Sequence, residues 1–219
     1  MAHTEQPAES TTQYTAKAGK GARDGVVSEL ATFYEVKPGH EEELRAACER
    51  LANGLKSLPV EVNVQTGLRD ERHVIFDGGK RLAWFTTFET DWDPYVEDAF
   101  MRIGIDHFTD WIQHLTAADE WFAYIREAGG EEKYRTATNI TGTAQEKEER
   151  VGLSWLKKFL SDRQIPASGY YNAVSYLTHP EIRKAQLVYE AFQQVLDDPD
   201  AAEALQHPAL KPLLEQAAY

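Results

Sequence analysis

The sequence predicts an α+β fold, an antiparallel sheet with helices packed on one of its faces. Segments rich in β-branched and aromatic residues, which are typical of strands, recur through the first 130 residues. Two longer segments between them repeat apolar residues at the spacing of a helix. An Asp-Gly-Gly-Lys turn separates two of the strand segments and indicates a hairpin, hence antiparallel pairing.

The first half of the expected domain is a strand followed by a helix. Val26–Val36 has strand composition, and the Pro-Gly turn at Pro38 and Gly39 ends it. Glu41–Leu58 is expected to be helical, with three glutamates in its first turn, where the helix dipole favours negative charge. Its buried face would consist of Leu44, Ala47, Cys48, Leu51, Leu55 and Leu58.

Further strand segments and a second helix complete the expected domain. The strands are expected at Val60–Gly67, at Arg72–Phe76 with Arg81–Glu89 after the turn, and at Trp121–Glu127. The second helix is expected over Asp91–Leu115, with Asp93 as its N-cap and Pro94 in its first position. The order β-α-β-β-α-β is the ferredoxin-like arrangement, with both helices on one face of the sheet.

The chain divides by composition into three regions. Residues 1–24 are polar and without periodicity, so we expect a disordered arm. Residues 25–130 form the ferredoxin-like α+β domain. Residues 131–219 contain short amphipathic segments separated by prolines, which predicts a helical C-terminal extension packed on the first domain.

The overall charge narrows the classes of function. The 36 acidic residues exceed the 23 basic ones, for a net charge of -13. Such a chain is not suited to non-specific binding of nucleic acid or anionic membranes, which both require a positive field. The single cysteine, Cys48, allows no internal disulfide, and no apolar run has the length of a signal peptide or a membrane span. We therefore expect a cytoplasmic protein.

Two histidines lie on the apolar stripe of the second expected helix. At about 100° per residue, Val96, Phe100, Ile103, His107, Trp111 and His114 fall within roughly 80° of one another. Both imidazoles would therefore face the sheet. Seven residues separate them by roughly 10 Å along the axis, too far for one shared metal ion, and no HExxH or Cys/His cluster is present.

Three interpretations of His107 are open. It could be a structural core histidine, a general base or hydrogen-bond donor in a ligand pocket, or an axial ligand of haem iron. For His114 a structural role is favoured, because it lies near the helix end and Asp110, four residues earlier, could pair with it. Arg72 belongs to a local basic group that could attract an anionic ligand or be solvated, and His73 would face the opposite side of its strand.

Several segments resemble a known family. FYEVKPGHEEEL resembles the opening of dimeric α/β barrel proteins, which include antibiotic-biosynthesis monooxygenases, haem-degrading monooxygenases, and dye-decolorising or chlorite-dismutase-type haem enzymes. RHVIFDGGKRLAWFTTFETDWDPYVEDAF and QIPASGYYNAVSYLTHPEIRKAQLVYEAFQQVLD are similar to a peroxidase-like subgroup, although Arg69 stands near the place of that subgroup's histidine. The resemblance implies a homodimer that pairs sheet to sheet and a ligand held between sheet and helices. Haem-binding members use a histidine on the second helix, where His107 falls.

These observations lead to an expected function. We expect a small oxidative enzyme, haem-dependent or cofactor-free, that acts on an apolar or aromatic small molecule between sheet and helices. His107 would be the base or the haem ligand and Arg72 would contact the ligand, with pocket walls formed by Trp84, Phe88, Phe100 and Trp111. The alternatives are a non-catalytic dimeric ligand-binding or assembly protein, and a cyclase or isomerase on the same scaffold.

Overall fold

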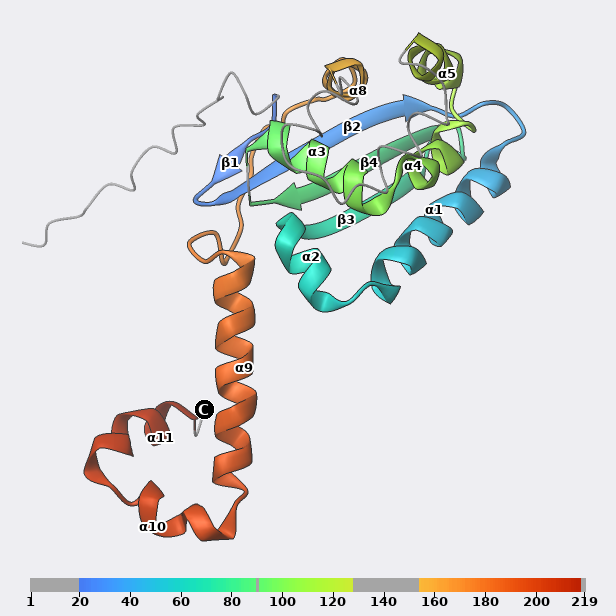
Figure 1. The fold of residues 1–219 in the computed structure, drawn as a ribbon. Helices are drawn as coiled ribbons and strands as arrows, with labels where there is room; N and C mark the ends of the chain where they lie inside the picture. The colour runs from blue at the N-terminus through green and yellow to red at the C-terminus, as the bar shows by residue number, and fades with distance from the viewer. Residues whose placement is uncertain (1–19, 90, 128–153, 218–219) are drawn as a thin grey trace, which may run out of the picture. The chain divides into compact units, whose positions relative to one another are not determined.

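The computed structural model describes residues 20–89, 91–127 and 154–217 (Figure 1). Contacts divide the chain into two compact units, Met1–Thr178 and His179–Tyr219. Most of the expected arm, residues 1–19, and the expected domain boundary near residue 130 lie outside the described residues.

The first unit contains a four-stranded antiparallel sheet, which confirms the α+β class. The strands are β1 (Arg23–Asp24), β2 (Val27–Glu35), β3 (Leu68–Phe76) and β4 (Arg81–Phe88), in the spatial order β1-β2-β4-β3. Strands β2 and β3 both pair antiparallel with β4, so they run parallel to each other. The turn between β3 and β4 is the one the sequence predicts.

Helices cover one face of this sheet. They are α1 (Glu41–Ser57), α2 (Val60–Thr66), α3 (Trp92–Ile103), α4 (Ile105–Ile112), α5 (Ala118–Glu127) and α8 (Ser154–Ser161). Figure 1 shows α1 to α4 lying over the same side of the strands. The side chains between the layers, among them Leu30, Leu82 and Trp84 of the sheet and Phe108 and Trp111 of α4, are buried in one core.

Two segments expected to be strands are helices. Val60–Thr66 alternates apolar and polar residues, but Pro59 precedes it and Gly67, with φ 71°, ends it as a left-handed cap. The buried residues of α5 are Ala118, Trp121 and Ile125, which have helical spacing. The segment Trp121–Glu127 alone is too short to show that spacing. Tertiary burial at that spacing overrides the strand propensity of the segment.

The ferredoxin-like order is therefore not confirmed, because its last strand is α5. Backbone groups on the outer edge of β2 instead form hydrogen bonds with a later segment, residues 163–165. The amide of Phe33 donates to the carbonyl of Arg163 at 3.1 Å, and the amide of Ile165 donates to that of Ala31 at 2.9 Å. Thr32 and Gln164 form an isolated bridge between these bonds.

The second expected helix is broken in two at Gly104. Its φ of 91° and ψ of 141° end α3 and begin α4 in a conformation that residues with a Cβ rarely adopt. The single stripe expected over Asp91–Leu115 is therefore divided. In α4 the buried residues are Ile105, Phe108, Trp111 and Ile112, and His107 lies off that face and is exposed.

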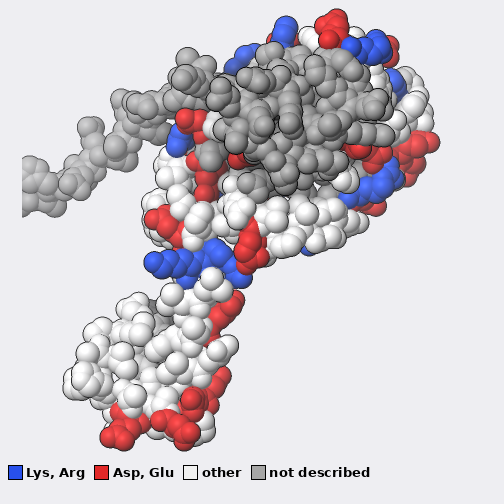
Figure 2. Space-filling model, in the orientation of Figure 1, with Lys and Arg blue, Asp and Glu red and all other residues white. Residues whose placement is uncertain are grey.

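The second unit is helical. Its elements are α9 (His179–Leu196), η1 (Pro199–Ala201), α10 (Ala202–Leu205), η2 (Pro208–Leu210) and α11 (Lys211–Ala217). None of its described residues is buried, and Leu187, Val188 and Tyr189 are exposed on α9. Acidic residues gather where α9 ends and α10 begins (Figure 2). Across the described part of the chain, no helix has the length and apolar character of a membrane span.

Candidate functional site

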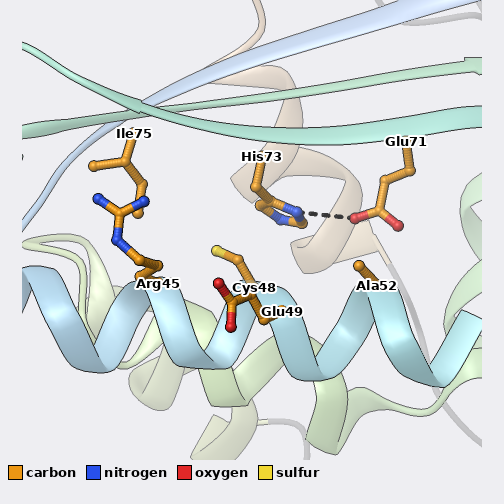
Figure 3. Close-up of a pocket in the computed structure, with 7 residues that line it drawn as sticks. All are labelled: Arg45, Cys48, Glu49, Ala52, Glu71, His73 and Ile75. Atoms are coloured by element: carbon orange, nitrogen blue, oxygen red, sulfur yellow. Dashed lines mark ion pairs between the residues drawn. The ribbon is translucent and has the colours of Figure 1, made fainter.

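A cavity of about 240 Å³ lies between α1 and β3 (Figure 3). Its residues come from one side of the helix and one face of the strand, because they are spaced three or four apart on α1 and two apart on β3. The lining residues are Arg45, Cys48, Glu49 and Ala52 of α1 and Glu71, His73 and Ile75 of β3.

His73 is held at this cavity by two tryptophans. Its side chain is 5% exposed. Trp84 lies directly opposite His73 on β4, with nearly parallel rings whose centroids are 6.1 Å apart. The edge of the Trp111 ring system approaches it from α4 at 5.0 Å. These contacts fix the plane of the imidazole before any ligand binds.

A carboxylate lies beside the same ring. Nδ1 of His73 is 3.0 Å from Oε1 of Glu71, whose side chain is 10% exposed (Figure 3). The two atoms lie at ion-pair distance, but Oε1 of Glu71 has no hydrogen-bond partner among the described residues. A neutral imidazole that carries its hydrogen on Nδ1, beside the carboxylate, has its lone pair on Nε2. Nε2 is buried and has no hydrogen-bond partner among the described residues. In that tautomer Nε2 is the ring nitrogen that can accept a proton.

The nitrogen atoms of the two neighbouring indole rings also lack hydrogen-bond partners. Nε1 of Trp84 and Nε1 of Trp111 are buried without a hydrogen-bond partner in the described part of the chain. Most buried polar atoms in folded proteins are hydrogen-bonded, so three unsatisfied nitrogens in one ring cluster are unusual. An ordered water, an ion or a catalytic role explains such unsatisfied groups in native proteins.

The remaining groups of the cavity differ in charge and reactivity. Burial raises the pKa of Cys48 to about 12, and the nearby carboxylates of Glu71 and Asp110 act in the same direction. The group is therefore a neutral thiol at physiological pH, which is a weak nucleophile. Arg45 and Glu49 are exposed at the rim, and Figure 3 shows the Arg45 side chain reaching from α1 towards β3. The guanidinium can bind a carboxylate.

His107 lies elsewhere. It is exposed and lines a shallow pocket of about 60 Å³ together with Leu51, Gly54, Leu55, Leu58 and Ile103. The expectation that it faces the sheet is wrong, because that expectation assumed one unbroken helix through Gly104. Pockets that enclose small molecules measure about 300–1,000 Å³. The residues around His107 therefore do not fit a haem.

The other expected site residues are divided between three places. Trp84 and Trp111 adjoin His73, as described above. Phe88 is stacked on Tyr95 at 4.1 Å and Phe100 on Phe108 at 3.7 Å, all within the core. Of the expected pocket wall, only the two tryptophans contact a residue that lines the cavity, and neither lines the cavity itself.

Arg72 lies on the opposite face of β3 from the cavity. Its side chain is 65% exposed, and its guanidinium lies 5.5 Å from the centroid of the Phe85 ring. His73 faces the other way, as the alternation of a strand predicts. The sequence did not predict Glu71 beside His73, although the Glu-x-His spacing on one strand face was the available signal.

Comparisons with known proteins identify no relative: no family model matches the chain, and no curated protein or solved structure is significantly similar to it.

Proposed function

We propose that the protein is an enzyme that uses His73 as a general base, without a cofactor, on a small apolar or aromatic molecule. The observation that carries the proposal is the geometry of His73. Its Nδ1 is 3.0 Å from a buried carboxylate, while its buried Nε2 has no partner among the described residues. The residue also lines a cavity.

Glu71 has two effects on this base. Its negative charge favours the tautomer that carries hydrogen on Nδ1, and the same charge stabilises the imidazolium that forms. The tryptophan rings exclude water from one side of the imidazole, which strengthens the interaction between the two charges. A well-placed general base accelerates proton transfer by about 10²–10⁴-fold.

The rim of the cavity indicates the class of substrate. Arg45 supplies a positive charge that suits a carboxylate, beside the negative Glu49 at the same rim, and Ile75 and Ala52 supply apolar contacts. A volume of about 240 Å³ restricts the enclosed part of the ligand to a small group. The substrate is a small apolar or aromatic carboxylic acid with an acidic C–H or O–H group.

The same proton transfer begins two reaction types. In a cofactor-free oxygenase, the carbanion or phenolate formed by His73 passes electrons to molecular oxygen. In an isomerase or cyclase, the same intermediate is reprotonated or closes a ring without oxygen. The haem-dependent form of the oxidative reaction is not part of the proposal, because the surroundings of His107 do not fit the group.

Isotope exchange tests the base directly. Aryl-substituted α- and β-keto acids are incubated with the protein in D₂O, and proton NMR follows the replacement of their enolisable hydrogens by deuterium. We expect exchange that His73→Asn slows about 10²–10⁴-fold, whereas the exposed-histidine control His107→Asn does not change it. Equal exchange by wild type and His73→Asn would contradict the proposal. Oxygen uptake in a parallel assay separates the oxygenase from the isomerase or cyclase.

A second candidate is a non-catalytic ligand-binding protein. The favouring observation is that one ion pair and two ring contacts are enough to hold His73 as a structural residue. In that case the keto acids bind and raise the melting temperature, but their hydrogens do not exchange faster than in buffer.

A further inference from the structure

A second pair of titratable groups lies away from this cavity, where α1 begins and α4 ends. Nδ1 of His40 and Nδ1 of His114 are 3.0 Å apart, although 74 positions separate them in the sequence. The ring centroids are 5.4 Å apart and the ring planes are tilted by 51°. Both side chains are partly buried, so they remain accessible from solvent.

Backbone hydrogen bonds fix the two segments against each other. The amide of Lys37 donates to the carbonyl of His114 at 2.9 Å, and Nζ of Lys37 donates to that of Gln113 at 3.0 Å. The amide of His40 donates to the carbonyl of Lys37 at 3.1 Å. The imidazoles therefore meet because their backbones are anchored, and only their side-chain torsions remain to be adjusted by a ligand.

We propose that His40 and His114 bind one divalent copper or nickel ion through their Nδ1 atoms. Metal–imidazole bonds measure about 2.0–2.1 Å, so nitrogens 3.0 Å apart subtend roughly 95° at a shared ion. That angle suits the square-planar or tetragonal geometry of Cu²⁺ and Ni²⁺, whereas a tetrahedral ion needs a wider one. Water completes the coordination, because the described residues contain no group of three or more suitable ligands.

The charges around the pair favour a bound cation only moderately. Asp110 and Glu43 act on His114 with negative charge, and Arg50, which is 2.8 Å from Asp110, offsets part of it. Burial, and next the neighbouring His40, lower the pKa of His114. The neutral form of His114, which is the form that ligates a metal, is therefore favoured.

Without metal, one ring donates its Nδ1 hydrogen to the other. An arriving ion replaces that hydrogen, which moves to Nε2 or to solvent, and each ring turns so that both lone pairs converge on the ion. The metal-bound pair therefore differs from the hydrogen-bonded pair in the position of one hydrogen and in the orientation of both rings.

Calorimetric titration of the full chain with CuCl₂, NiCl₂ and ZnCl₂ tests the site. All proteins carry His3→Ala, because an amino-terminal Met-Ala-His sequence can itself chelate copper and nickel. We expect one equivalent of copper, bound more tightly than zinc, and a loss of about tenfold or more in copper affinity in His40→Ala and His114→Ala. His107→Ala is the matched control, since it removes an exposed histidine from α4.

Two results would overturn the site. One is copper affinity that is unchanged in the His40→Ala and His114→Ala proteins. The other comes from electron paramagnetic resonance of the copper-loaded parent, which needs no variant to fold. Hyperfine splitting from two equivalent imidazole nitrogens is expected, and a spectrum without nitrogen coupling would contradict the proposal.

Discussion

At the scale of single residues, the proposed chemistry depends on the groups around His73. The sequence placed His73 on the opposite side of its strand from Arg72, and the structure confirms this. Its partners were not predictable in the same way. Trp84 comes opposite it only through the β3–β4 register, and Trp111 only through the position of α4 on the sheet. Neither property follows from local spacing.

Glu71 is expected to matter for the rate of proton transfer. Glu71→Gln keeps the side-chain size but removes the charge that orients and stabilises the imidazolium, so deuterium exchange of a keto acid should slow about 10–100-fold. The matched control is Glu49→Gln, an exposed glutamate at the rim of the same cavity. If both variants exchange at the wild-type rate, Glu71 has no part in the chemistry.

Cys48 is expected to resist alkylation. An ordinary cysteine has a pKa near 9, whereas burial raises that of Cys48 to about 12. At pH 8 the thiolate fraction, and with it the rate of reaction with iodoacetamide, should be about a thousandfold lower in the folded protein than in urea. The folded-state rate should keep rising with pH up to about 12. A rate that levels off near pH 9 would show an unperturbed thiol.

At the scale of elements, the sequence predicted the helices and strands that have a long periodic pattern or clear turn residues at their ends. The helix α1, the strand β2 and the β3–β4 hairpin lie where periodicity and turn residues place them. The segments Val60–Thr66 and Trp121–Glu127 are too short for a strand pattern to be told from a helix, and their burial decides the outcome. One glycine, Gly104, divides the remaining helix and thereby moves His107 out of the expected stripe.

The break at Gly104 can be tested by adding a Cβ. In Gly104→Ala the positive φ becomes strained, so urea denaturation should show a loss of about 1–3 kcal/mol in the free energy of unfolding. Gly54→Ala is the control, since Gly54 lies inside α1 and its added Cβ meets no atom within 4 Å. That change should instead stabilise the protein by about 0.5–1 kcal/mol. Equal effects of the two changes would mean that Gly104 is not required for the break.

At the scale of the whole molecule, the face of the sheet away from the helices carries apolar side chains next to the exposed Arg72. Phe33 and Phe85 meet edge to face at 5.9 Å, and Val74 on the same face is 43% exposed. This face is where the expected homodimer would pair sheet to sheet. Sequence could suggest such pairing only by resemblance, because an interface between copies leaves no periodicity beyond that of an ordinary strand.

Sedimentation equilibrium tests the homodimer. The wild-type chain should sediment with twice the mass of one chain, and Val74→Asp should shift it to the monomer because a carboxylate would be buried unpaired in the interface. Val60→Asp, at an exposed valine of α2, is the control and should remain dimeric. A wild-type chain that is monomeric at micromolar concentration would contradict the prediction of a homodimer.

The proposed function depends on which nitrogen of the His73 ring carries the hydrogen. Nitrogen-15 NMR of selectively labelled histidine at pH 8, assigned with His73→Asn, measures it directly. We expect His73 to carry its hydrogen on Nδ1, facing Glu71, with an unprotonated Nε2 whose resonance shifts when a keto acid is added. A hydrogen on Nε2 with a bare Nδ1 would contradict the account, since the nitrogen assigned to accept the proton would already hold one.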